Sequence, residues 1–320
     1  LIKDVTLREL VEKIEVRKKT WREVIADIHD LFREKLTPAE RQAIREGFTQ
    51  NNRIEDLCNK AADPVHYADL PEPVRQPLKD FFTELYTDVL KRKPFEDAYE
   101  TLKAYFDKLT DASGLTVCPF CALNDLKSRF HDGRDAFDHF LPKSAYPFNS
   151  INFRNLAPIC HECNSDEKLA KDPLFGGAGK MGRRSATYPF ANKVAEIAVT
   201  VTFTADLNSI RVASLEPSQF QVHLTCAEVE AAATWDAVFD VRRRYAGKIC
   251  QKMSEWLQEL CKEYRRRKGR MDVEQFFEDK LEDFRESPLA SGNFLRYAIF
   301  SKLWGDGILA ASMREMMANE

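Results

Sequence analysis

Four of the eight cysteines stand in two closely spaced pairs, Cys118-Pro-Phe-Cys121 and Cys160-His-Glu-Cys163. A spacing of two residues points both sulfurs of a pair at one spot, and four thiolates are the ligand set of a tetrahedral structural zinc. The segment between the pairs is small and polar, so zinc would contribute much of its folding free energy. We therefore predict a structural Zn²⁺ held by these four cysteines.

Reactive side chains lie between and just after the two pairs. Asp138 and His139 stand in a short strand-like run, so their side chains should point to opposite faces. Asp138 can bind a divalent cation or orient His139, whose imidazole can take a proton from water. Asn164 opens a predicted helix, where its amide oxygen can bind Mg²⁺ or cap the helix. Lys168 and Lys171 share this helix and can meet phosphate oxygens.

The order of these residues resembles that of a known family. The pattern Cys-x-x-Cys, Asp-His-x-x-Pro-Lys and Asn-Leu-x-Pro-x-Cys-x-x-Cys-Asn-x-x-x-Lys, within residues 115–175, resembles the zinc-stabilised HNH (ββα-metal) endonucleases. The resemblance implies a β-hairpin and a helix that grip one catalytic cation. It implies that Asp138 and Asn164 bind this cation, that His139 is the general base and that Asn155 braces the loop behind it. Because Asn164 stands where some members carry His, the expected cation is Mg²⁺ or Mn²⁺.

The resemblance also implies an activity, which is hydrolysis of phosphodiester bonds in DNA, with RNA also open as a substrate. Chains with an HNH module between long helical segments resemble the nuclease subunits of bacterial anti-phage systems such as Septu and retron-linked defence, which partner an ATPase. The helical flanks would then be docking surfaces. Two alternatives remain open. One is a restriction or homing endonuclease, for which the sequence offers no DNA-reading motif, and the other is a non-catalytic zinc-bound module that binds nucleic acid or protein.

Further basic residues follow the second cysteine pair. The glycine-rich stretch 176–185 lacks the spacing of a phosphate-binding P-loop. It can be a simple solvated loop, or its basic side chains can contact a nucleic-acid backbone. The full set of candidates for such contacts is Lys143, Lys168, Lys171, Lys180, Arg183 and Arg184.

Hydrophobic periodicity places the reactive groups in a mainly helical chain. Residues 1–112 read as helices, 113–192 as the zinc-bound HNH module with its basic loop, and 193–320 as a β-hairpin followed by helices. The hairpin is expected to turn near 206–208, with 220–224 as a third strand. The predicted fold class is mainly α with a small α+β insert, namely helical segments around a ββα-metal module plus a short β-hairpin in the C-terminal half.

Composition narrows the class of protein. The chain has 320 residues, of which 44% are hydrophobic, so it can bury a substantial core. Its formal net charge is -3, so any attraction to nucleic acid must come from local clusters of Lys and Arg. No apolar run approaches the roughly 20 residues that cross a bilayer. The first residues lack the apolar core of a secretion signal. We therefore expect a cytoplasmic protein with no membrane partner.

Overall fold

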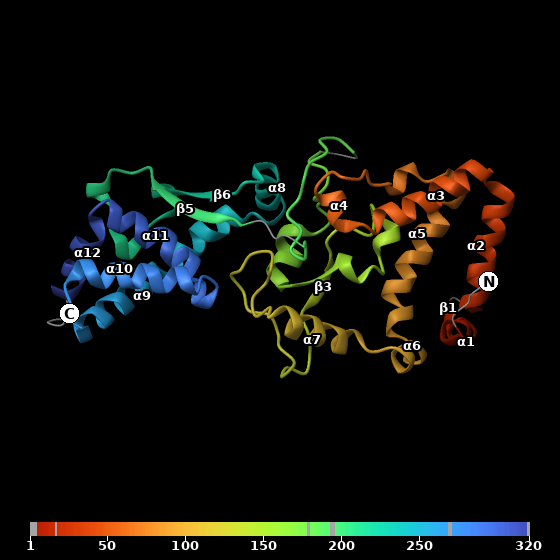
Figure 1. Ribbon diagram of the computed structural model, residues 1–320, viewed down its shortest axis with the longest axis horizontal. Coiled ribbons are helices and arrows are strands. Elements are labelled where there is room, and N and C mark those ends of the chain that lie inside the picture. The colour runs from red at the N-terminus through yellow and green to blue at the C-terminus, as the bar shows by residue number, and fades with distance from the viewer. Residues whose placement is uncertain (1–4, 17, 178–179, 193–195, 268–270, 319–320) are drawn as a thin grey trace. The chain divides into compact units, whose positions relative to one another are not determined.

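The computed structural model describes residues 5–16, 18–177, 180–192, 196–267 and 271–318. The chain divides into two compact units, Leu1–Val194 and Ala195–Glu320 (Figure 1). The expected boundary at 112/113 lies inside the first unit, so the N-terminal helices and the cysteine-containing module belong to one body. The expected boundary at 192/193 adjoins residues 193–195, which lie outside the described residues.

The first unit begins with a series of α-helices. They are α1 Val5–Lys13, α2 Trp21–Lys35, α3 Pro38–Asn51, α4 Ile54–Cys58, α5 Glu72–Thr87, α6 Lys93–Ala98 and α7 Leu102–Ser113. Thr20 and Thr37 begin α2 and α3, because each accepts a hydrogen bond from the N–H of a glutamate three positions on, whose side chain bonds back to the threonine N–H. Gly114 ends α7 in the left-handed conformation, at φ 64°. A small ribbon of β1 Glu15–Val16 and β2 Lys19–Thr20 separates α1 from α2.

One hydrophobic core joins the helices to the cysteine-containing module. It comprises buried residues of the α2–α5 region together with one side chain of the module: Leu36, Ile44, Leu70, Val74, Leu78, Phe82 and Phe148. Phe148 lies in the short turn η3 Pro147–Asn149, and its ring packs edge-on against that of Phe82 on α5 at a centroid distance of 5.4 Å. Because this turn shares a core with α5, the module is fixed to the N-terminal helices.

The module contains one pair of strands followed by a short helix. Strand β3 Ala136–His139 pairs antiparallel with β4 Leu156–Ile159, which places Asp138 opposite Ala157 and His139 opposite Leu156. Turns η3 and η4 Phe153–Asn155 lie in the connection between the strands. After β4 the chain forms η5 Cys163–Lys168, a single wide helical turn with the π-type hydrogen-bond pattern.

The second unit combines a two-stranded sheet with five helices among its described residues. Strands β5 Ala198–Phe203 and β6 Phe220–Thr225 pair antiparallel. The helices are α8 Val229–Phe239, α9 Val241–Arg267, α10 Val273–Glu286, α11 Asn293–Gly305 and α12 Ile308–Ala318. Asp240 separates α8 from α9 in a left-handed conformation, at φ 50°.

The predicted hairpin is present, but its second strand was assigned wrongly. The stretch that pairs with β5 is β6, which the sequence suggested as a third strand. The intervening residues form the turns η6 Leu207–Ser209, η7 Val212–Ser214 and η8 Pro217–Gln219. Apolar side chains in and beside these turns, such as Ile210, Val212 and Leu215, are buried. They alternate with polar residues as in a strand, although the backbone here forms turns.

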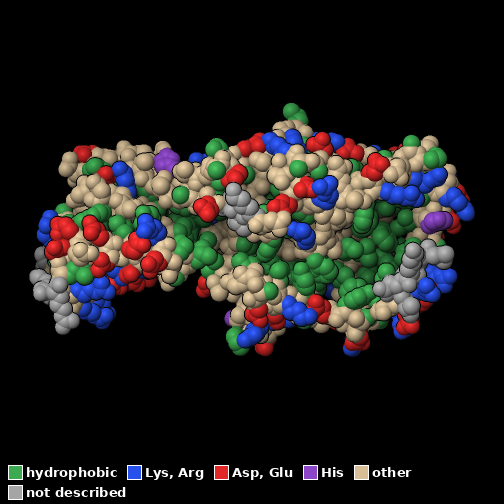
Figure 2. Space-filling model, in the orientation of Figure 1, with side chains coloured by type: hydrophobic (Ala, Val, Ile, Leu, Met, Phe, Trp, Pro, Cys, Tyr) green, Lys and Arg blue, Asp and Glu red, His purple; other side chains and the backbone are tan. Residues whose placement is uncertain are grey.

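The observed fold is thus mainly α with small two-stranded sheets, as the fold class predicted. Within the described ranges, we find no helix that combines the length and the apolar character needed to cross a membrane. Lysine and arginine side chains are interspersed with acidic ones over the face seen in Figure 2.

Candidate metal centre and active site

The four cysteines of the two pairs meet at one buried point. Their sulfur atoms all lie within 4.8 Å of one another, and the sulfurs of Cys121 and Cys160 are 3.9 Å apart. Cys118 and Cys121 come from the turn after α7, whereas Cys160 and Cys163 follow β4. All four side chains are buried. A closed set of four sulfurs fits a structural metal ion such as zinc, which prefers tetrahedral sulfur ligands.

Main-chain geometry holds these sulfurs in place. The Ala122 N–H donates to the Cys118 carbonyl across 2.8 Å, and Ala122 adopts a φ of 54° as the turn closes. The Asn124 amide donates to the Cys160 sulfur across 3.3 Å. Hydrogen bonds among the four thiols lower the pKa of Cys160, the largest effect coming from Cys118, and raise the pKa of Cys118 and Cys163. The proximity of the four buried sulfurs confirms the predicted group as one that can hold a metal such as zinc.

Asp138 lies in the interior beside a buried lysine. Asp138 is 6% exposed and Lys168 is 1% exposed. The Lys168 ammonium lies 3.2 Å from Asp138 Oδ1 and 3.0 Å from Oδ2, and it donates to the His139 carbonyl across 2.9 Å. Burial raises the pKa of Asp138, and the charge of Lys168 opposes this shift. Lys168 is therefore the counter-ion of Asp138, because η5 packs its last residue against the end of β3. The sequence had suggested that Lys168 contacts phosphate.

His139 is held as a neutral imidazole. Its Nε2 lies 2.9 Å from the carbonyl oxygen of Ser150. A carbonyl only accepts hydrogen bonds, so Nε2 carries the proton and Nδ1 keeps a lone pair. Burial lowers the pKa of His139 to about 4. The Tyr86 ring meets the imidazole edge-on, with centroids 4.3 Å apart. A neutral ring with an unprotonated Nδ1 can accept a proton from a bound molecule.

Two polar side chains fix the loop behind this imidazole. Asn155 is fully buried, and its Oδ1 accepts a hydrogen bond from the Leu141 N–H across 2.8 Å. Its Nδ2 donates to the carbonyls of Leu141 and Asn149, at 3.0 and 3.2 Å. Ser150 Oγ donates to the carbonyl of Phe82 on α5 across 2.6 Å. Asn155 thus closes the loop on itself, and Ser150 ties it to α5.

Asn164 lies inside η5 and does not cap it. The residue that precedes the helix is Glu162, and no side chain makes a cap hydrogen bond there. The Asn164 N–H donates to the Cys160 carbonyl across 3.1 Å, and its side chain is partly exposed. Lys168, four positions later, contacts Asp138. The two predicted cation ligands, Asp138 and Asn164, therefore stand on elements that touch each other.

The basic side chains of the glycine-rich loop bond within the first unit. Arg183 donates to two main-chain carbonyls in and after α4, at 2.6 and 3.2 Å. Arg184 donates to the carbonyls of Asp172 and Pro173, just before the loop, at 2.9 and 3.3 Å. Lys180 pairs with Asp69 at 2.7 Å. These hydrogen bonds and the ion pair hold the loop to the first unit. The sequence had left open a simple solvated loop or contacts of these side chains to nucleic acid. Residues 178–179 of the loop lie outside the described residues.

The remaining basic candidates differ in their surroundings. Lys171 is exposed, whereas Lys143 is half-buried and lies 5.1 Å from the centroid of the Tyr86 ring. Tyr86 and Ser150 touch His139 and were missed in the sequence. Tyr86 stands on α5, far from the cysteine pairs along the chain, and no spacing pattern connects the two.

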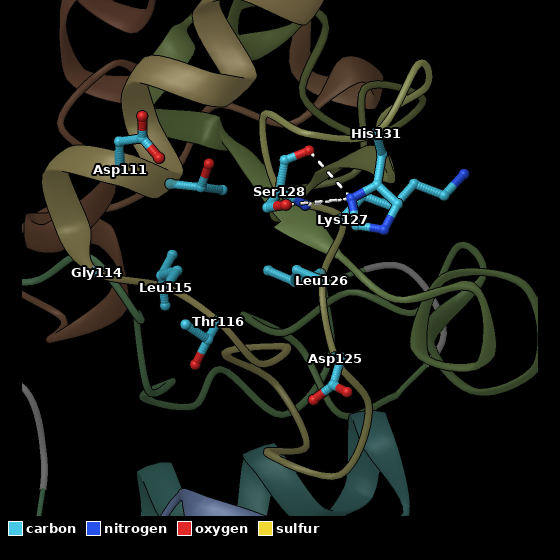
Figure 3. Close-up of a pocket in the computed structure, with 10 residues that line it drawn as sticks. Asp111, Gly114, Leu115, Thr116, Asp125, Leu126, Lys127, Ser128 and His131 are labelled. Atoms are coloured by element: carbon cyan, nitrogen blue, oxygen red, sulfur yellow. Dashed lines mark hydrogen bonds between the residues drawn. The ribbon is translucent and has the colours of Figure 1, made fainter.

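An open cavity of about 590 Å³ lies beside the first cysteine turn (Figure 3). Its walls are the end of α7 and residues of the two arms of the loop that follows. His131 lies on one wall, where its Nδ1 accepts a hydrogen bond from the Ser128 N–H across 3.1 Å. Neither Asp138 nor His139 lines this cavity, so it is separate from the candidate site.

Comparisons with known proteins find one partial similarity. No family model matches the sequence, and no solved structure matches it. The chain is similar to protein ea31 of Escherichia phage lambda, with 32% identity over 87 residues. That match covers 27% of this chain and 26% of the phage protein, so the chain spans about a quarter of the length of the relative it matches.

Proposed function

We propose that this chain is a metal-dependent endonuclease of the HNH type that hydrolyses phosphodiester bonds of DNA. The observation that carries the proposal is the setting of His139. Its imidazole is neutral, its Nε2 proton is committed to the Ser150 carbonyl, and its Nδ1 can take a proton. It stands next to a buried Asp138 in a strand pair that leads into η5, the arrangement that the ββα-metal resemblance implies.

His139 is the proposed general base. Nδ1 takes the proton of the attacking water, and the Ser150 carbonyl accepts the Nε2 hydrogen throughout, which stabilises the charged ring. A pKa of about 4 makes His139 a weak base in the free protein. The negative charge of a phosphodiester bound beside the ring favours its protonated form and strengthens it as a base. Asn155 positions the loop that carries Ser150.

Asp138 and Asn164 are the residues that would hold Mg²⁺ or Mn²⁺. The buried Oδ2 of Asp138 accepts no hydrogen bond within the described chain, although the Lys168 ammonium lies 3.0 Å away. A carboxylate oxygen with unused lone pairs and an amide oxygen are ligands that these hard cations prefer. When bound, the cation stabilises the charge that develops on the phosphate and on the departing 3′-oxygen.

The buried ion pair between Asp138 and Lys168 favours a second candidate function. A carboxylate already neutralised by Lys168 attracts a divalent cation less strongly than a lone one does. In this alternative, the module binds nucleic acid or protein without cutting. Cleavage assays separate the two candidates, because only the first requires His139.

We further propose that the nuclease acts in the cytoplasm as the effector of an anti-phage defence complex. The support is the layout, in which long helices such as α2, α5 and α9 accompany the module and offer surfaces for an ATPase. RNA remains open as a second substrate. Co-purification of an ATPase with the tagged chain from its host is the expected result, whereas a fully active lone chain contradicts this assignment.

The test of the nuclease proposal is incubation of plasmid DNA with Mg²⁺ or Mn²⁺. We expect cleavage by the wild type and a loss of at least about 100-fold in His139→Ala, the scale of general-base catalysis. His131→Ala is the matched control, because His131 is an exposed histidine of the same module outside the candidate site. Equal cleavage by wild type and His139→Ala rejects the assigned base. Inactivity of the wild type on DNA and RNA with either cation rejects the function.

A further inference from the structure

Two lysines flank the aromatic ring that touches His139. Lys143, four residues after β3, places its ammonium 5.1 Å from the centroid of the Tyr86 ring. Lys91, in the turn η2 Val89–Lys91 just after α5, places its ammonium 5.9 Å from the same centroid. Tyr86 in turn lies 4.3 Å from the His139 imidazole, centroid to centroid. Elements distant in sequence thus bring two positive charges to the surroundings of His139.

These two charges lack the compensation that other lysines have. Within the described chain, no carboxylate lies within ion-pair distance of Lys91 or Lys143. By contrast, Lys168 is paired with Asp138 at 3.0 Å, and Lys180 and Lys103 also have aspartate partners. Burial and the neighbouring charge of Lys91 both lower the pKa of Lys143. Two like charges held near one ring repel each other unless an anion offsets them.

The other charged groups near the ring do not supply that anion. Asp138 is already committed to Lys168. Arg134 adds a third positive charge, which stacks 4.9 Å from the Phe137 ring centroid and donates to the Asp135 carbonyl. The surroundings of Tyr86 therefore carry a local excess of positive charge on a chain whose formal net charge is -3.

We propose that Lys91, Lys143 and Tyr86 form a phosphate subsite that binds the backbone of a polynucleotide beside His139. The two ammoniums bind phosphate oxygens, and the Tyr86 ring holds them at the required spacing through cation–π interactions. The identity of the ligand rests on the proposed nuclease function. The subsite itself is tested by binding, which requires no cleavage.

The test measures binding of a fluorescently labelled single-stranded DNA by anisotropy, over a series of salt concentrations and without added divalent cation. The double variant Lys91→Gln/Lys143→Gln removes both charges. We expect it to bind roughly tenfold or more weakly and to lower the slope of log affinity against log salt by about 1.4, or 0.7 for each single-strand phosphate that is no longer neutralised. The matched control is Lys93→Gln/Lys103→Gln, which removes two lysines that pair with aspartates.

A second pair of variants tests the ring. Tyr86→Phe retains the aromatic face and is expected to bind DNA as the wild type does. Tyr86→Leu removes the face, and binding is expected to weaken several-fold. Circular dichroism and zinc content, measured for every variant, show that the first unit is folded.

The outcomes separate this inference from the nuclease proposal. DNA that binds through Lys91 and Lys143 but is never cut supports the subsite and counts against the nuclease. DNA that is cut at the wild-type rate and bound equally well by the lysine double variant overturns the subsite and leaves the nuclease standing. Equal decreases in affinity in the double variant and in its control also overturn the subsite, because they reveal a non-specific effect of net charge.

Discussion

His139 donates its Nε2 hydrogen to the main-chain carbonyl of Ser150 across 2.9 Å. The Ser150 hydroxyl in turn donates to the Phe82 carbonyl of α5 across 2.6 Å. The orientation of the candidate base is therefore set by a helix of the N-terminal region, whose helices the sequence suggested were docking surfaces for a partner. Because burial lowers the pKa of His139 to about 4, this hydrogen bond holds a neutral ring at pH 7.

The depressed pKa of His139 predicts how stability varies with pH. In the unfolded chain the pKa is 6.5, whereas in the folded chain it is about 4, so the unfolded chain binds more protons between these values. Stability is then complete above pH 6.5 and falls as the pH drops toward 4, by about 2 kcal/mol at pH 5. Urea unfolding of the wild type and of His139→Gln at pH 7.5 and 5 measures this. An equal loss in both proteins would contradict the assignment.

Removal of Lys168 should leave the buried carboxylate of Asp138 without its counter-ion. We predict that Lys168→Met destabilises the first unit by about 3 kcal/mol, since an uncompensated buried charge is costly. The double variant Asp138→Asn/Lys168→Met should recover part of this loss. Lys93→Met is the control, because Lys93 forms an exposed pair and its loss should change little. Urea unfolding checks all three, and additive losses in the double variant would show that the two groups are not coupled.

The four-cysteine group predicts one tightly held metal per chain. Cys121→Ser should lower the zinc content measured by elemental analysis and open the module to hydrogen exchange, because the metal supplies much of its folding free energy. Cys226→Ser is the matched control, since Cys226 lies in the second unit outside the group. Full zinc content in Cys121→Ser would remove Cys121 from the ligand set.

Asn155 should contribute to stability through three hydrogen bonds. Asn155→Ala leaves the Leu141 N–H and the carbonyls of Leu141 and Asn149 without these partners in the interior. We predict a loss of about 3 kcal/mol in unfolding free energy, the scale of several unsatisfied buried groups. Asn208→Ala, at an exposed turn, should change it little. Similar unfolding free energies for the two variants would mean that the hydrogen bonds of Asn155 do not stabilise the loop.

Local chemistry was predictable from the sequence, and the long-range contacts were not. The cysteine pairs and the threonine caps of α2 and α3 depend on residues three positions apart, a spacing that can be seen in the sequence. The burial of Lys168 and the approach of Tyr86 to His139 depend on how η5 and α5 pack, and hydrophobic periodicity says only that a helix has an inner face. The same limit explains why the second strand of the hairpin was assigned wrongly. Buried apolar residues in successive turns gave the alternation of apolar and polar residues that is typical of a strand.

The most direct test of the central claim is the dependence of kcat/KM for DNA cleavage on pH, which reports the ionisation of the free protein. If buried, neutral His139 is the base, cleavage at saturating Mg²⁺ should show no acid limb between pH 7.5 and 5.5, and it should fall only as the pH approaches the pKa of about 4. His139→Ala should lose this limb together with most of the rate. An acid limb centred near pH 6.5, or an unchanged rate in His139→Ala, would contradict the claim.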